Sequence, residues 1–148
     1  MPVDVTSEIV IGRPRDQVAP YAMDPDNVPK WYEKISSVQW RTSPPFRLGS
    51  QVAFVAHFLG RRLAYTYEVV DFALGHRLVM RTANGPFPME TTYTFESMPN
   101  GETRMMLRNR GNPTGFAAWI APFMALAVRR ANVKDLALLK RVLEGRAG

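Results

Sequence analysis

The feature that most constrains the fold is a series of short segments in which apolar and polar residues alternate, each followed by a turn signal. Alternation with a period of two is typical of a strand with one face in the core and one in solvent. The segments are Ile35–Arg41, Gln51–Phe58, Arg62–Phe72, Arg77–Thr82, Met89–Glu96 and Thr103–Arg110. Because a parallel partner needs a long crossover, we expect neighbouring segments to pair antiparallel.

The N-terminal part adds a strand and two short helices. Val3–Ile11 alternates like the later segments, and the sequence Gly12-Arg13-Pro14 interrupts it. Proline suits the first turn of a helix, so a short helix is expected from about Pro14 to Ala22. The sequence Asp24-Pro25-Asp26-Asn27 signals a turn or cap, after which a second short helix runs to about Tyr32.

The last segment predicts a long helix that covers the apolar face of the sheet. From Phe116 onward, apolar residues recur at helical spacing, and no glycine follows until Gly145. The predicted helix has about 25 residues and is ~35–40 Å long at 1.5 Å per residue. Pro122 either kinks it or marks the start of its regular part. The polar phases of the strands face water, and opposite charges on adjacent strands are expected to pair there.

Composition predicts one domain over residues 1–148 and argues against several classes of function. The chain has 148 residues, 46% of them hydrophobic and 22% charged, as in ordinary globular proteins. It has no cysteine, which removes disulfides and thiolate chemistry and favours a cytoplasmic location. His57 and His76 are far apart and have no partner at ligand spacing, so no metal site is expected.

The net charge of +6 raises the question of nucleic-acid or membrane partners. The basic residues are scattered, and they form neither a Lys/Arg block nor a nucleic-acid-binding motif. We therefore expect no nucleic acid as a partner. No apolar stretch is long enough for a membrane span, and the first residues lack the basic-then-apolar pattern of a signal peptide. Stable membrane insertion is not expected.

Four short stretches resemble a known family. They are Asp24–Trp31 (a D-P-x-x-x-x-x-W corner), Tyr67–Val70, the G-x-T-x sequence Gly101–Arg104, and Asp135–Lys140 (D-L-x-x-L-K). Together with the element order they resemble the SRPBCC superfamily, in the polyketide cyclase/dehydrase-like branch related to START lipid-transfer domains and pollen allergens. The resemblance covers nearly the whole chain.

The resemblance implies an α+β helix-grip fold, in which a seven-stranded curved antiparallel sheet wraps around the long C-terminal helix. Two short helices follow the first strand. Members of this family hold lipids, sterols, polyketides or other apolar molecules in a cavity between sheet and helix, and some cyclise or dehydrate polyketides. The implied partner is a small hydrophobic ligand, with no cofactor, in a monomer or a homodimer. Fold alone does not fix the ligand.

The inward phase of the strands and the start of the long segment supply the candidate ligand-binding residues. They combine aromatic and methionine side chains with a few hydroxyl and amide groups, as small-molecule pockets do. The candidates are Trp40, Phe54, Phe58, Tyr65, Tyr67, Met80, Met89, Thr91, Tyr93, Met105, Asn109, Phe116, Ile120, Phe123 and Met124. The alternative is that these residues simply fill the core, and the cavity itself rests on the resemblance.

Three functions stay open. The first is binding or transport of an apolar small molecule without covalent chemistry. The second is a cyclase or dehydratase in which Tyr65 or Tyr67 polarises a ketone and an unidentified base removes a proton. The third is an interaction protein whose groove takes up a partner or a lipid.

The base required by the second function is not found in the sequence. The strand phase places His57 outward, and His76 is in a turn. Asp135 and Glu144 are expected on the helix surface or its rim. No catalytic residue is therefore predicted.

Two arginine pairs could influence the choice of ligand. Arg61-Arg62 and Arg129-Arg130 are most simply solvated charge. At a cavity mouth, however, either pair would attract an anionic ligand such as a fatty acid or a carrier-bound thioester.

Overall fold

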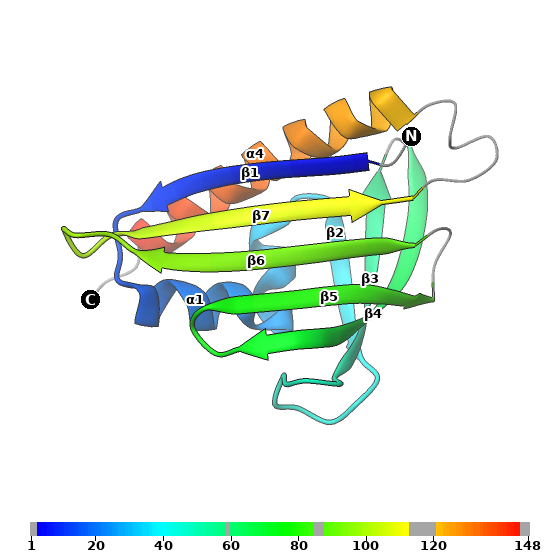
Figure 1. Ribbon diagram of the computed structural model, residues 1–148. Helices are drawn as coiled ribbons and strands as arrows, with labels where there is room; N and C mark the ends of the chain where they lie inside the picture. Colours follow the sequence, from blue (N-terminus) through cyan, green and yellow to red (C-terminus); the bar gives the residue numbers. More distant parts are fainter. Residues whose placement is uncertain (1–2, 59, 85–87, 113–120, 146–148) are drawn as a thin grey trace.

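The computed structural model describes residues 3–58, 60–84, 88–112 and 121–145. Within these residues, seven strands form one antiparallel sheet in the order β1-β7-β6-β5-β4-β3-β2 (Figure 1). The strands are β1 (Val3–Ile11), β2 (Ile35–Trp40), β3 (Gln51–Phe58), β4 (Arg61–Ala73), β5 (Arg77–Asn84), β6 (Met89–Ser97) and β7 (Thr103–Gly111). Strands β2 to β7 follow one another as neighbours, and β1 closes the order by pairing with β7.

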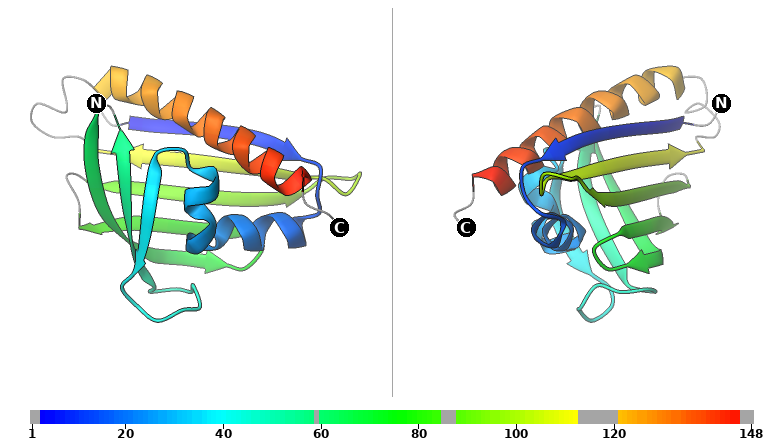
Figure 2. Two further views of the ribbon diagram at one scale, coloured as in Figure 1. Left: turned by 180° about the vertical axis from the view of Figure 1, so that it is seen from behind. Right: turned by 60° about the vertical axis from the view of Figure 1, so that its left-hand side comes forward.

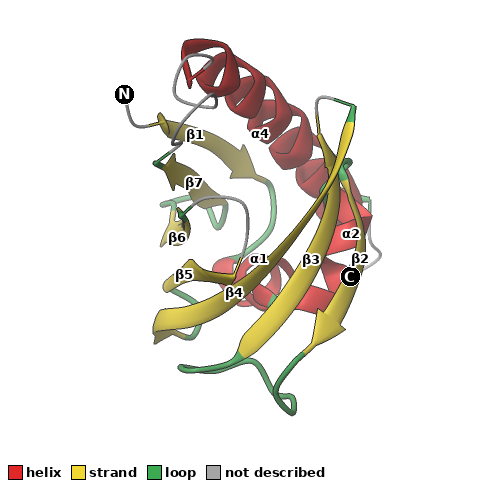
Figure 3. Ribbon diagram, turned by 90° about the vertical axis from the view of Figure 1, so that its right-hand side faces the viewer, coloured by secondary structure: helices red, strands yellow, loops and turns green. Residues whose placement is uncertain are grey.

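The sheet is strongly curved, and the bend lies along β4. The pairing of β4 with β5 shifts register between Thr66 and Tyr67 and again between Val69 and Asp71. Such irregularities bend the strand that contains them and increase its twist. As a result β2 and β3 run across the direction of β5, β6 and β7, and the sheet encloses a concave face (Figures 1 and 3).

A long helix lies across this concave face. It is α4 (Ala121–Glu144), and it runs along β1 before its C-terminal end meets the short helices (Figure 2). Pro122 is in its first turn, where a missing N–H costs little. The short segments are α1 (Arg15–Met23), the 3-10 turn Pro25–Asn27 and α2 (Val28–Trp31). The expected α+β helix-grip fold is confirmed, with the 3-10 turn at the predicted turn signal and α2 as the second short helix.

The C-terminal half of α4 packs closely on the sheet and on the short helices. Leu136, Leu139 and Leu143 are buried with Ile11 and Trp31 in one core cluster. Trp31 and Leu139 have no exposed surface. Burying a leucine side chain contributes about 1.5–3 kcal/mol, so this contact is a main source of stability for the fold.

The end of α4 is also tied to the corner between β1 and α1. The Glu144 carboxylate accepts a hydrogen bond from the backbone N–H of Gly12 (2.6 Å) and pairs with Lys140. Arg13 donates to the Glu144 carbonyl oxygen (2.6 Å). A Cβ atom at position 12 would come within 3.1 Å of Glu144 Oε2, so glycine allows this close approach.

Charged side chains on the outer face of the sheet pair across strands, as the polar phases predicted. Arg104 pairs with Glu8 and Arg108 with Asp4, both at 2.7 Å. Glu90 forms salt bridges with Arg81 at 2.7 Å and with Arg110 at 3.5 Å. These pairs are solvent-exposed, and each such pair typically contributes only about 0–1 kcal/mol.

Candidate ligand-binding cavity

A cavity of about 170 Å³ lies between the concave face of the sheet and the N-terminal half of α4. Its walls are mostly apolar, with a few hydroxyl, amide and carboxyl groups. The lining residues are Tyr32, Lys34, Ile35, Phe54, Ala56, Leu63, Tyr65, Tyr67, Met89, Asn109, Met124, Val128, Ala131, Asn132 and Asp135. Apolar walls with few polar groups are typical of a small-molecule site.

Small side chains explain why this half of the interface is hollow. On α4 the inward face passes through Met124, Val128, Ala131 and Asn132, at the spacing of one helical side. Ala131, and Ala56 on β3, present only a methyl group to the space. Further along the same helix, Leu136 and Leu139 fill the equivalent space completely.

A chain of hydrogen bonds crosses one wall of the cavity. Thr91 Oγ1 donates to Asn109 Oδ1 (2.6 Å), and Asn109 Nδ2 donates to Asn132 Oδ1 (3.0 Å). These bonds leave the amide nitrogen of Asn132 buried and without a hydrogen-bond partner among the described residues. A buried donor that lacks a partner costs about 1–3 kcal/mol, so a hydrogen-bond acceptor is favoured beside it.

Asp135 lines the same cavity, and this corrects the expectation that it lies on the helix surface or its rim. The residue is only 3% exposed, and its Oδ1 accepts a hydrogen bond from the backbone N–H of Glu33 (3.0 Å). Burial raises the pKa of its carboxyl group to about 6, although the bond from Glu33 acts in the opposite direction. A carboxyl group titrating near neutrality inside a cavity is suited to proton transfer.

Tyrosine hydroxyls form the remaining polar groups of the walls. Tyr65 and Tyr67 on β4 line the cavity, as the strand phase predicted. The hydroxyl of Tyr32 lies 2.8 Å from that of Tyr93. Burial raises the pKa of Tyr32, Tyr67 and Tyr93 well above the ordinary value. All three hydroxyls therefore stay protonated at neutral pH, and one of the Tyr32 and Tyr93 hydroxyls donates to the other.

The structure brings six of the predicted binding residues together at the cavity. These are Phe54, Tyr65, Tyr67, Met89, Asn109 and Met124. Four others, Met80, Thr91, Tyr93 and Met105, are buried but do not line it. Phe116 and Ile120, and the side chain of Phe58, lie outside the described residues. Ligand binding by any of these residues stays a prediction.

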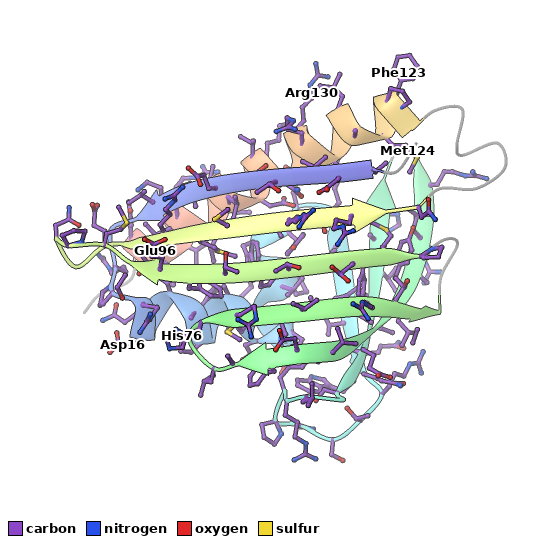
Figure 4. The ribbon with its side chains drawn as sticks, in the orientation of Figure 1. Asp16, His76, Glu96, Phe123, Met124 and Arg130 are labelled. Carbon is purple, nitrogen blue, oxygen red and sulfur yellow. The ribbon has the colours of Figure 1, made fainter. Side chains whose placement is uncertain are left out.

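Two predicted residues lie away from the cavity. Trp40 packs edge-on against Phe46, and its Nε1 donates to Asp26 Oδ1 (2.8 Å). Phe123 is 72% exposed and projects from α4 away from the sheet, whereas Met124 points under the helix (Figure 4). The inward position expected for Phe123 is therefore wrong, because one residue along a helix turns the side chain by about 100°.

Sequence reasoning missed nine of the lining residues, and four of these are on α4. Val128, Ala131, Asn132 and Asp135 follow Met124 at intervals of four, seven, eight and eleven residues, which marks one helical face. That signal was present in the sequence. It was obscured because alanine, asparagine and aspartate do not form a recognisable apolar stripe.

The two histidines form no further site among the described residues. His57 and His76 are both exposed, and His76 lies in the turn between β4 and β5, facing Arg15 of α1 (Figure 4). Among the described residues, no group of three or more histidine, aspartate or glutamate side chains is placed to hold a metal ion. No helix among the residues that the structure describes is both long and apolar enough to cross a membrane.

Comparison with known proteins agrees with this architecture. The model of the family described as "Polyketide cyclase / dehydrase and lipid transport" matches residues 2–144. The chain belongs to this family. This confirms the resemblance to the START and polyketide cyclase superfamily. No curated protein matches the chain.

Three solved structures illustrate how widely the fold is shared. A protein from Thermus thermophilus has 19% identity and a TM-score of 0.83, with 97% of this chain and 99% of that one covered. The Zhui aromatase/cyclase from a Streptomyces species has 15% identity and a TM-score of 0.83, covering 99% and 98%. A START superfamily protein from Mycobacterium smegmatis has 13% identity and a TM-score of 0.78, covering 96% and 97%. At these identities the likeness shows the fold.

Proposed function

We propose that this protein binds a small apolar molecule carrying a hydrogen-bond acceptor, such as a ketone, between its sheet and α4. The observation that carries the proposal is an apolar cavity with Asn132 in its lining, a residue whose buried amide nitrogen has no hydrogen-bond partner among the described residues. A ketone oxygen beside Asn132 would remove the cost of that unpaired donor, and the apolar body of the ligand would gain from leaving water.

The size of the cavity sets the scale of the ligand. An engineered apolar cavity of about 150 Å³ holds benzene, so about 170 Å³ is matched to a single substituted ring. The family description and the Zhui aromatase/cyclase support a ligand of aromatic or polyketide type.

The test compares acetophenone with α-methylstyrene, which has the same shape but carries a CH₂ group in place of the ketone oxygen. Binding is followed by NMR titration. We expect both to bind and the ketone to bind about five- to tenfold more tightly, which corresponds to one hydrogen bond of ~1 kcal/mol. Asn132→Leu is expected to abolish this preference, and the exposed Asn112→Leu to leave it unchanged. If neither compound binds, the proposal fails.

A second function is favoured by the position of Asp135. Its carboxyl group, with a pKa of about 6, lines the same cavity as the Tyr65 and Tyr67 hydroxyls. In a cyclase- or dehydratase-like reaction, a tyrosine would donate a hydrogen bond to a ketone oxygen. The Asp135 carboxylate would then take the proton from the adjacent carbon, leaving an enolate. This supplies the base that sequence reasoning did not find.

The decisive measurement is hydrogen–deuterium exchange of the acetophenone methyl group in D₂O. A protein with this activity accelerates the exchange, Asp135→Asn abolishes the acceleration, and Tyr67→Phe or Tyr65→Phe reduces it. If bound acetophenone exchanges no faster than free acetophenone, only the binding function stands. If exchange is accelerated and both tyrosine variants leave it intact, the tyrosine-centred mechanism is refuted.

A further inference from the structure

A second hollow of about 310 Å³ shares part of its lining with the cavity. The two spaces share Lys34, Ala131 and Asp135 in their linings, so they are neighbours between α4 and the segment that enters β2. The inner space is mostly apolar, whereas the outer one is lined largely by charged side chains. We call this second, charged space the outer hollow and infer that it is the mouth of the cavity.

Positive charge predominates at this mouth. Lys34, Arg130 and Lys134 contribute three cations, opposed by the exposed Glu33 and the buried Asp135. Arg130 and Lys134 are four residues apart on α4, so they lie on one side of the helix, where like charges repel each other. Near neutral pH, where Asp135 is largely ionised, these five groups leave one net positive charge, which favours an anion over a neutral group.

These cations differ from those on the outer face of the sheet. There Arg81, Arg104 and Arg108 each form a 2.7 Å salt bridge with an acidic side chain. None of the three mouth cations forms a salt bridge with another described residue, although the charge of Lys34 reaches Asp135 and favours its ionised form. These cations are therefore free to pair with an anionic group of a ligand.

The positions of the two arginine pairs, Arg61-Arg62 and Arg129-Arg130, show which of these residues line the mouth. Arg130 lines the mouth, whereas Arg129 lines a different hollow over the outer face, with Asp4 and Arg108. Gly60 lines the mouth, but the neighbouring Arg61 does not. Of the two arginine pairs considered for an anionic ligand, only Arg130 lines the mouth. Lys34 and Lys134, which are far apart in sequence, are the other two cations there.

We propose that the outer hollow holds the carboxylate of an amphipathic ligand whose apolar part fills the inner cavity. This inference rests on the proposed binding function and adds a substrate class to it: an elongated molecule with an acceptor near Asn132, an apolar middle, and an anionic end beside Lys34, Arg130 and Lys134. These two ends match the two polar regions that border the joined spaces.

The test uses two ligands that differ in charge at one end, para-acetylbenzoate and its methyl ester. Their dissociation constants are measured by NMR titration at low ionic strength, near pH 7. We expect the carboxylate to bind about five- to tenfold more tightly than the ester, as three partly screened charges predict. The triple variant Lys34→Gln, Arg130→Gln, Lys134→Gln is expected to equalise the two affinities.

The matched control removes three other exposed positive charges, in Arg41→Gln, Arg47→Gln, Arg141→Gln. These side chains line neither space, so this variant is expected to keep the preference for the carboxylate. If both ligands bind the native protein equally, or if the mouth variant keeps the preference, the inference is overturned while the binding function stands. If neither ligand binds, nor acetophenone, the binding function fails and this inference fails with it.

Discussion

The two halves of α4 pack against the same sheet in different ways. Towards the C-terminus, Leu136, Leu139 and Leu143 are buried in a close-packed core. Towards the N-terminus, Val128 and Ala131 border an open space with Asn132 and buried Asp135 beside it. The comparison teaches that one helix holds the fold together with one half and leaves room for a ligand with the other.

The largest expected change in stability tests the close-packed C-terminal half of α4. Leu139→Ala removes a fully buried side chain and leaves a cavity, so we expect a loss of ~3 kcal/mol in the free energy of unfolding. Met124→Ala, in the open half, is expected to cost less than ~1 kcal/mol, because Met124 is only partly buried and already borders empty space. Urea unfolding of both variants measures the difference, and equal losses would contradict the division of the helix.

The next effect concerns Asp135 and pH. The folded protein binds this proton more tightly than the unfolded chain, because the pKa of Asp135 rises from 3.8 to about 6. The contribution of protonated Asp135 to the free energy of unfolding is therefore fully present below about pH 4. As the pH rises through 6, ~2–3 kcal/mol is lost to the buried charge.

Asp135→Asn should remove that loss, since the amide oxygen can still accept the Glu33 N–H. We expect the variant to be ~1–2 kcal/mol more stable than the native protein near pH 8 and about equal to it near pH 4. Glu96→Gln, at an exposed position, serves as the control in urea unfolding across this range. A variant that is less stable at pH 8 would show that the ionised carboxylate is favourable where it lies.

The smallest change in stability is expected from filling the open half. Ala131→Leu places a larger apolar side chain in the cavity and should change the free energy of unfolding by less than ~1 kcal/mol, in the stabilising direction. Binding of acetophenone should fall at least tenfold. Ala137→Leu, at an exposed position of the same helix, should leave binding unchanged. Undiminished binding by Ala131→Leu would place the ligand elsewhere.

Much of the fold follows from local patterns. The alternation in Val3–Ile11 and Gln51–Phe58 predicts both strands with the bounds that the structure has. These patterns are informative because one face of each strand meets water, so the side-chain phase is visible in the sequence. The same phase placed Tyr65 and Tyr67 beneath the helix.

The candidate site was harder to predict, because its helical side combines small and polar residues. Asp135 was expected on the helix surface or its rim, because no carboxylate fell in the predicted inward phase. Its actual position depends on one backbone N–H, that of Glu33, which lies 102 residues away in sequence. A partner at that distance cannot be read from local periodicity, and neither can the meeting of Lys34 with Arg130 and Lys134 at the mouth.

The bonds of Glu144 to the β1–α1 corner have a mechanical consequence. They hold the last turn of α4 in place. If this helix moves to admit a ligand, it should therefore rotate as a rigid body about its C-terminal end. With 24 residues at 1.5 Å per residue, a tilt of about 5° displaces the far end by ~3 Å. A slight rotation at Glu144 would thus open the cavity widest at Met124, while the leucines near the hinge keep their contacts.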